Sequence, residues 1–166
     1  KFAIENIPSD WETNRLTTLG EFYKGKNITK TDLVKQGYPC ILYSEIYTKF
    51  NLVFSEANSF IDEFQFKQST KITKGNFLFT SSGETVEDIG KSILYDGEKD
   101  IAIGGDIIVF KLFEQNKFDN KFLAYVFNSF FFNYQKSSSS NGEIVVHIYE
   151  KQLREIKFNY PKLSQQ

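Results

Sequence analysis

The stretch from Asp119 to Lys136 constrains the fold of this chain more than any other. Asp119 or Asn120 can cap the start of a helix there, and the polar tract 137–142 ends it, because serine hydroxyls compete for backbone hydrogen bonds. The large apolar residues share one face at a 3.6-residue period: Phe122, Leu123, Val126, Phe127, Phe130, Phe131 and Tyr134. The spacing predicts one long amphipathic helix that must pack against another apolar surface.

Short strands account for most of the remaining apolar sequence. The apolar spacing of residues 60–66 fits neither a strand nor a short helix cleanly, so both stay open there, and a helix is expected near 151–156. Gly104-Gly105 predicts a bulge or tight turn. The strand segments, dense in β-branched and aromatic residues, are 40–50, 77–79, 93–95, 101–113 and 143–149. This order predicts an α+β fold, with a twisted, mostly antiparallel β-sheet core, one long amphipathic helix and a C-terminal helix start.

Composition narrows the class of protein. A chain of 166 residues can bury one sizeable core, and its 18 Phe and 9 Tyr predict that aromatic rings dominate that core. No run approaches about 20 apolar residues and no leader pattern opens the sequence, so we expect a cytoplasmic protein with no membrane partner. Because Cys40 and His147 are the sole residues of their types, an internal disulfide and a Cys/His metal site are excluded.

Recognisable catalytic patterns are missing from the sequence. His147 falls within an apolar strand segment, and Cys40 follows Pro39, so both are expected to be structural. The glycines lack the spacing of dinucleotide or phosphate loops, and the Asn-Pro-Pro-Tyr or Asp-Pro-Pro-Tyr tetrapeptide of amino-methyltransferases does not occur. The acidic turn with Glu84, Glu87 and Asp88 is expected to be solvated rather than to hold a cation. We therefore expect a non-catalytic chain with no cofactor or metal of its own.

Several segments in a fixed order cover almost the whole chain. They are Trp11 with Leu19-Gly20-Glu21, then 37–48, 75–79, 105–108, 122–125, and 142–148 leading to Leu153, Ile156, Pro161 and Gln165. Together they resemble the target-recognition domain of the specificity subunit of type I restriction-modification systems. The resemblance implies a recognition domain at 1–160, which reads one half of a bipartite target, and the truncated start of a helical spacer at 161–166.

The resemblance also implies the partners. Double-stranded DNA is one of them, and the others are a modification subunit, which would bind S-adenosylmethionine, and a restriction subunit in the full complex. The net charge of −1 and the pI near 5.9 are low for a free-standing nucleic-acid binder. If the methyltransferase partner supplies much of the phosphate-binding charge, the isolated chain binds duplex DNA weakly and loses that binding at high salt.

Polar side chains in three loops, together with one lysine cluster, are the candidates for DNA contact. Direct readout needs hydrogen-bonding groups on a rigid scaffold, whereas phosphate contacts need cations or backbone amides. Glu45 could accept from a cytosine amino group, and Asn141 could pair with adenine. The candidate set is Tyr43, Ser44, Glu45, Tyr47, Thr48, Lys49, Lys67, Lys71, Lys74, Thr80, Ser81, Ser82, Lys136, Ser137, Ser138, Ser139, Ser140 and Asn141.

Two alternatives from other classes stay open at this point. The aromatic content alone favours a protein-interaction or carbohydrate-binding module. A catalytic domain with an unrecognised site is the other.

Overall fold

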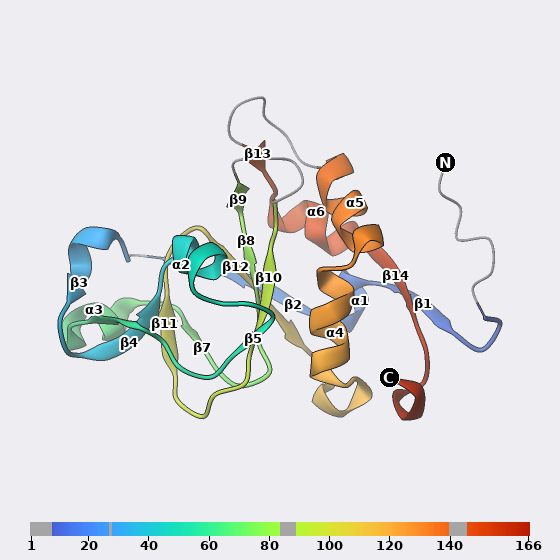
Figure 1. The fold of residues 1–166 in the computed structure, drawn as a ribbon, viewed down its shortest axis with the longest axis horizontal. Coiled ribbons are helices and arrows are strands. Elements are labelled where there is room, and N and C mark those ends of the chain that lie inside the picture. The colour runs from blue at the N-terminus through green and yellow to red at the C-terminus, as the bar shows by residue number, and fades with distance from the viewer. Residues whose placement is uncertain (1–7, 27, 84–88, 140–145) are drawn as a thin grey trace.

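A computed structural model describes residues 8–26, 28–83, 89–139 and 146–166 of the chain. Two five-stranded sheets lie at its centre (Figure 1). The first has the order β2 (Gly20–Lys24), β12 (Ile107–Leu112), β8 (Phe77–Thr80), β10 (Ser92–Tyr95), β5 (Val53–Phe54). The second has the order β3 (Leu33–Val34), β6 (Ser59–Ile61), β4 (Tyr38–Ile41), β11 (Ile101–Ile103), β7 (Lys71–Ile72). Two further strand pairs are β1 (Glu12–Arg15) with β14 (Lys157–Tyr160), and β9 (Ser82–Gly83) with β13 (Val146–His147).

Antiparallel pairing dominates among the described strands, and the parallel pairs there are β10 with β5 and β11 with β4. The predicted α+β class with mostly antiparallel strands is therefore confirmed. The chain crosses from the second sheet to the first through a turn at Gly104-Gly105, as the glycine pair predicts. A Cβ at position 25 would lie 1.9 Å from the Gly104 carbonyl oxygen, so the backbones can approach this closely only because residue 25 is glycine.

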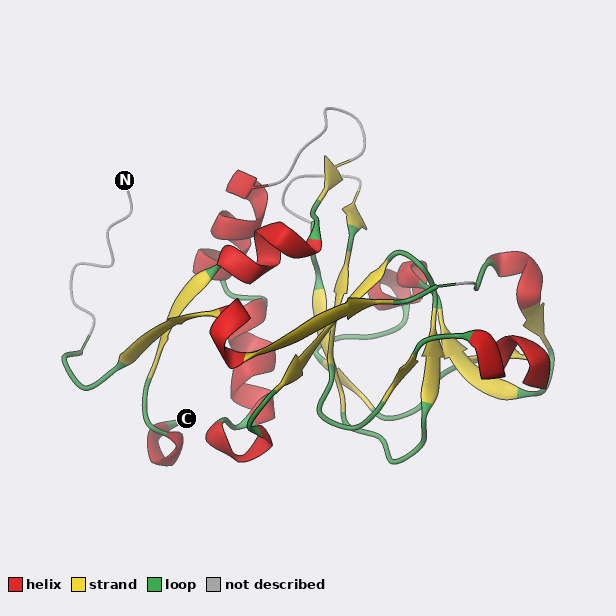
Figure 2. Cartoon of the chain, turned by 180° about the vertical axis from the view of Figure 1, so that it is seen from behind, coloured by secondary structure: helices red, strands yellow, loops and turns green. Residues whose placement is uncertain are grey.

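The helices gather in two places (Figure 2). The described α-helices are α1 (Leu16–Leu19), α2 (Tyr43–Thr48), α3 (Glu63–Gln68), α4 (Asn120–Phe127), α5 (Phe130–Ser139) and α6 (Glu150–Glu155), and the 3-10 turns are η1 (Lys30–Asp32), η2 (Gln115–Lys117) and η3 (Leu163–Gln165). Helices α4, α5 and α6 lie together beside the first sheet, whereas α3 lies at the far end of the second (Figure 1). Among all the described residues, no helix has the length and apolar character needed to span a membrane.

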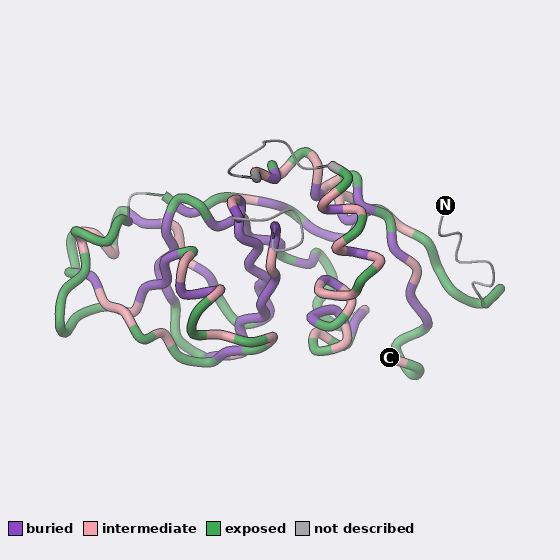
Figure 3. Tube along the Cα trace, turned by 45° about the horizontal axis from the view of Figure 1, so that its top comes forward, coloured by how far each residue is buried: buried purple, intermediate pink, exposed green. Residues whose placement is uncertain are grey.

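The central strands of the first sheet, β8, β10 and most of β12, are buried on both faces, which explains why their sequences are nearly continuous apolar runs. In β8 the side chains alternate: Phe77 and Phe79 pack toward α4 and α5, while Leu78 packs toward the second sheet. All three are fully buried, as the central strands in Figure 3 show. Two cores thus share one sheet, and aromatic rings dominate the one beneath α4, as the composition predicts.

The predicted long helix is two helices, which corrects one part of the sequence interpretation. The helix breaks after Phe127, where the Asn128 side chain accepts from the Ser92 N–H at 3.1 Å and donates to the Ser92 carbonyl oxygen at 2.9 Å. These bonds fix the break between the two helices against β10. Helix α5 consequently turns a different face inward, so that Phe130 and Tyr134 are 73% and 56% exposed instead of buried.

One predicted strand and one segment left open between strand and helix both contain helix. Residues 40–50 were expected to form a strand, but only the end of β4 falls there and α2 follows it. The Glu45 carboxylate accepts from the Leu42 N–H at 3.0 Å, which closes the first turn of α2. Residues 60–66, which fitted neither template cleanly, contain the end of β6 and the start of α3. Helix near 151–156 is confirmed as α6, and strand β14 then follows it. The spacer start at 161–166 stays a prediction.

Candidate nucleic-acid interface

A chain of hydroxyl groups joins α2 to the end of β8. The Tyr47 hydroxyl donates to the Ser82 carbonyl oxygen at 2.9 Å and shares a 2.6 Å hydrogen bond with the Thr80 hydroxyl. Two of the three segments proposed from the sequence to contact DNA therefore meet in the structure. The first of them is a helix instead of a strand and loop, which makes it a stiffer support for Tyr47.

Strand β13 brings two aromatic side chains to the same end of the molecule. His147 pairs with Ser82 across the two strands, and its Nδ1 lies 3.1 Å from the Ser82 hydroxyl oxygen. The Tyr149 ring stacks on the His147 ring with 6.3 Å between centroids, while Ile148 between them points into the core. The Lys24 Nζ, at the end of β2, lies 5.9 Å from the centroid of the Tyr149 ring.

These side chains form a continuous surface, which we name the β13 row: Tyr47, Ser82, His147, Tyr149 and Lys24. The strands β9 and β13 that carry its centre project beyond both sheets at the top of Figure 1. The row offers hydroxyls and an imidazole, which both donate and accept, and an ammonium that suits phosphate. Such a set can read base edges and hold a backbone phosphate at once.

Glu45, proposed from the sequence to accept from cytosine, is occupied within the fold. Its side chain is buried at 5% residue exposure and accepts from Lys49 Nζ and the Ser59 hydroxyl, each at 2.7 Å. Together with the bond from Leu42, these contacts use the carboxylate oxygens to fix α2 against β6. We therefore remove Glu45 from the residues proposed to contact DNA. Lys49 neutralises it.

The other sequence candidates on these two segments differ in access. Tyr43 and Thr48 are exposed on α2, and Ser44 is half-buried, with its carbonyl oxygen accepting from the Thr48 hydroxyl at 2.9 Å. Thr80 and Ser81 are buried beneath the β13 row. They can support the row but cannot reach a groove themselves.

The lysine cluster predicted to bind phosphate lies elsewhere. Lys67 pairs with Glu63 at 2.7 Å, and Lys74 pairs with Glu98. The Lys71 ammonium lies 4.9 Å from the centroid of the Phe66 ring and donates to a backbone carbonyl at 3.0 Å. Lys74 precedes the start of β8, whereas the β13 row follows the end of that strand. Lys74 and the row therefore lie at opposite ends of β8, while Lys67 on α3 and Lys71 on β7 belong to the part of the chain around the second sheet (Figure 1).

The serine tract begins inside α5 instead of ending the helix. The Ser137 and Ser138 hydroxyls donate to the Tyr134 carbonyl oxygen at 3.0 and 2.7 Å, so they satisfy their hydrogen bonds on their own helix. Ser140 and Asn141, the remaining polar candidates of this loop, lie outside the described residues. Their contact with DNA stays a prediction.

Two further residues of α5 were proposed from the sequence. Lys136 is 1% exposed, with its ammonium directed into the protein, so it cannot contact a phosphate at the surface. The prediction missed this because a lysine before a serine tract suggests a solvated helix end. Ser139 is the last residue of α5.

Lys24, His147 and Tyr149 were not among the residues proposed from the sequence. The alternation of His147, Ile148 and Tyr149 carried the signal, since a buried Ile148 places its two neighbours on the opposite face. Lys24 had no such signal. Its place beside Tyr149 depends on the pairing of β2 with β12, which the sequence does not reveal.

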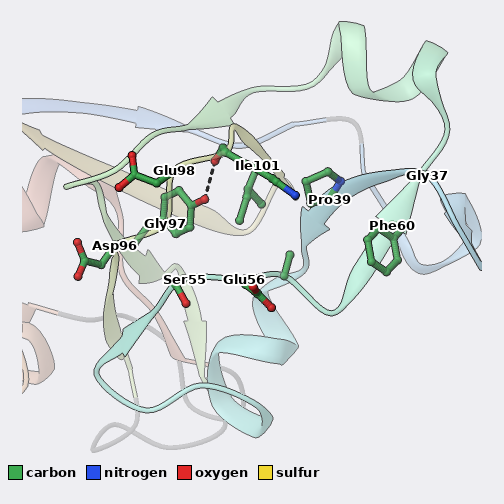
Figure 4. A pocket seen from close by; sticks show the side chains of 12 residues that line it. Gly37, Pro39, Ser55, Glu56, Phe60, Asp96, Gly97, Glu98 and Ile101 are labelled. Atoms are coloured by element: carbon green, nitrogen blue, oxygen red, sulfur yellow. Dashed lines mark hydrogen bonds between the residues drawn. The ribbon is translucent and has the colours of Figure 1, made fainter.

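A concave feature lies away from the β13 row (Figure 4). It is a cavity of about 530 Å³ with Pro39, Phe60 and Ile101 on its apolar wall and the carboxylates of Glu56 and Glu98 at its rim. An acidic rim repels phosphate, so this cavity does not suit a DNA backbone.

Replacing Tyr47 with phenylalanine tests the hydroxyl chain. The change keeps the ring and removes the hydrogen bonds of the phenol to Thr80 and Ser82, so we expect the free energy of unfolding to fall by about 1–2 kcal/mol. Chemical denaturation followed by circular dichroism measures this. The matched control is Tyr43→Phe on the exposed side of the same helix, where we expect a change within about 0.5 kcal/mol. Equal effects of the two substitutions would contradict the assignment.

Comparison with known proteins agrees with this architecture. A curated relative, the type I restriction enzyme MjaVIII specificity subunit of Methanocaldococcus jannaschii, is 27% identical over 175 residues. The alignment covers 100% of this chain and 39% of that protein. The chain therefore spans about two-fifths of the relative's length.

Solved structures share the fold. The type I restriction-modification S subunit from M. genitalium superposes with a TM-score of 0.60 at 15% identity, covering 96% of this chain and 36% of that one. The HsdS subunit from Thermoanaerobacter tengcongensis superposes with a TM-score of 0.63 at 12% identity, covering 99% of this chain and 36% of that one. A third solved chain comes from a structure on complex assembly and conformational transition of the type I R-M system. It superposes with a TM-score of 0.66 at 12% identity, covering 99% of this chain and 37% of that one.

The family model described as the type I restriction modification DNA specificity domain matches residues 8–166, which is nearly the entire sequence. With that extent of match, the chain belongs to the type I restriction-modification DNA specificity domain family.

Proposed function

We propose that this domain recognises one half of a bipartite DNA target and thereby directs a type I restriction-modification complex. The match of the specificity-domain family to residues 8–166 is the observation that carries the proposal. The β13 row supplies the contact surface. It brings polar, aromatic and cationic groups from four separate segments to one projecting end.

The physical case for readout depends on how the row is held. Ser82 and His147 belong to paired strands, and Tyr47 belongs to a helix whose first turn is closed by a buried carboxylate. Side chains held in this way keep a fixed spacing, which directional hydrogen bonds to base edges require. Lys24 lies at the same end and provides a cation for a phosphate.

The chemistry of modification belongs, in this proposal, to other polypeptides. The modification subunit binds S-adenosylmethionine and transfers the methyl group, and the restriction subunit cleaves. This domain chooses the double-stranded sequence on which they act, within the cytoplasm, and needs no cofactor of its own. Phosphate-binding charge from the modification subunit accounts for a net charge of only −1 in a DNA-reading chain.

Substitutions in the row, and at the sequence candidate Asn141 outside it, test the proposal through the methylation motif of the assembled complex. His147→Ala and Asn141→Ala are each expected to relax one position of the half-site, with a loss of discrimination of about 5–150-fold there. Lys24→Ala is expected to weaken all sequences alike and to lower the salt slope of binding by about one. Sequencing of methylated bases and salt titrations of DNA binding measure the two effects.

A lysine outside the row provides the control for these measurements. Lys67 is exposed and paired with Glu63, so Lys67→Ala removes the same charge far from the row. We expect it to leave both the motif and the salt slope unchanged. An unaltered motif after exchange of this whole domain for another specificity domain would reject the proposal.

A further inference from the structure

Lys136 lies in the core with both its hydrogen bonds directed to the backbone. Its Nζ donates to the Gly90 carbonyl oxygen at 2.6 Å and to the Phe127 carbonyl oxygen at 3.1 Å. The rings of Phe79 and Phe132 flank the Lys136 Nζ, with ring centroids 5.9 and 5.6 Å from it. Among the described residues, no acidic side chain forms an ion pair with it.

Each carbonyl has a structural role of its own. Phe127 ends α4, so its carbonyl oxygen lacks a helical donor and Lys136 supplies one across the break. Gly90 precedes β10 and has a φ of +67°, with its Cα facing the lysine stem so closely that an added Cβ would lie 2.9 Å from Lys136 Cδ. Lys136 thus ties the start of β10 to the end of α4.

Gly90 is connected to the β13 row through one peptide bond and one backbone hydrogen bond. Gly90 is bonded to Lys91, and the Lys91 carbonyl oxygen accepts from the Thr80 N–H at 3.1 Å. The Thr80 hydroxyl is the one that shares a hydrogen bond with Tyr47. A shift of Gly90 would therefore move Thr80, and with it the support of Tyr47 and Ser82.

We propose that Lys136 is a positioning residue for DNA readout: by holding Gly90 against the end of α4, it sets the spacing of the β13 row. The inference rests on the proposed function of that row. The contact geometry also accounts for a lysine on the inner face of α5, one turn after the buried Phe132, where an aliphatic residue would fill the same space. An aliphatic side chain cannot donate to two carbonyl groups.

The test compares three variants in the assembled complex, with DNA methyl transfer as the readout. Lys136→Met keeps the stem and removes the donors, and Lys136→Gln restores N–H donors on a shorter side chain. Gly90→Ala disturbs the same contact from the other side. We expect Lys136→Met and Gly90→Ala to raise KM for target DNA by about tenfold, with kcat at saturating DNA unchanged. Lys136→Gln is expected to raise KM by less than Lys136→Met does.

The control is Lys151→Met, an exposed lysine on α6, which is expected to leave KM unchanged. Should Lys136→Met fail to fold by circular dichroism, the Gln and Ala variants carry the same comparison. An unchanged KM in the folded variants would overturn the positioning role. If the unsubstituted complex itself does not discriminate target from non-target DNA, the proposed function fails instead, so the two failures are distinguishable.

Discussion

Replacing Phe127 with alanine should lower the free energy of unfolding by about 3–5 kcal/mol. The ring is fully buried at the centre of the aromatic core and contacts five others, with centroid distances from 4.9 to 6.1 Å: Phe77, Phe79, Phe110, Phe132 and Phe158. The five surrounding rings are held by their own strands and helices and cannot collapse freely into the space that the Phe127 ring leaves, so the cavity remains.

The control for this prediction stands three residues further along the chain. Phe130 is 73% exposed at the start of α5, so Phe130→Ala removes the same ring from solvent contact instead of from the core. We expect its effect to stay within about 0.5 kcal/mol. Urea denaturation of both variants, followed by circular dichroism, measures the difference. Similar losses for both would mean that Phe127 is not central to the core.

The second large effect concerns the pH dependence of stability. Burial lowers the pKa of Lys136 from 10.5 to about 7. Between these two values the unfolded chain holds a proton that the folded protein does not, so stability rises with pH across this window and falls as the pH drops toward 7. From pH 7 to pH 8.5 we expect the free energy of unfolding to rise by about 2 kcal/mol.

Lys136→Met isolates this contribution, because it removes the titrating group and retains the stem. Its free energy of unfolding is expected to stay flat where that of the unsubstituted protein rises. The measurement stops at pH 8.5, since burial raises the pKa of Cys40 and of Tyr23 to about 12, and ionisation of these groups in the unfolded chain lowers stability at higher pH. Parallel pH profiles for the two proteins would contradict a buried, largely neutral lysine.

The sequence predicts elements whose signal is local. Strands β8 and β10 are short apolar runs bounded by polar or glycine residues, and α6 follows a helical period, so each was located closely. The break between α4 and α5 was not, because the apolar period runs through it. Its cause is the Asn128 side chain bonded to Ser92, 36 residues earlier, and a periodicity within the helix contains no trace of that contact.

Helix α2 shows a different limit. Its aromatic and β-branched residues favour a strand by composition, yet Glu45 closes a helical turn at Leu42 and Ile46 is buried on the inner face. The spacing from Leu42 to Ile46 is helical, but four residues are too few for a period to outweigh composition. Tertiary packing therefore determines that this segment forms a helix instead of a strand.

Of the five residues of the β13 row, Tyr47 and Ser82 were among the sequence candidates, whereas Lys24, His147 and Tyr149 were not. The polar residues near Tyr47 and Ser82 were recognised as one surface, and the structure brings them into contact. His147 joins them from 65 residues further along the chain, through the pairing of β9 with β13. Strand pairing over such a separation leaves no mark in composition or spacing, which is why the resemblance to a family was more informative than the residues alone.

The pairing of β1 with β14 has a consequence for how this domain can be inherited. Glu12 lies opposite Tyr160, so the polypeptide enters and leaves the fold on adjacent antiparallel strands. A host protein can therefore carry the unit as a cassette, with both junctions side by side and little loop-closure entropy to overcome. Exchange of such cassettes between longer chains would alter one recognised sequence while the flanking architecture keeps its geometry.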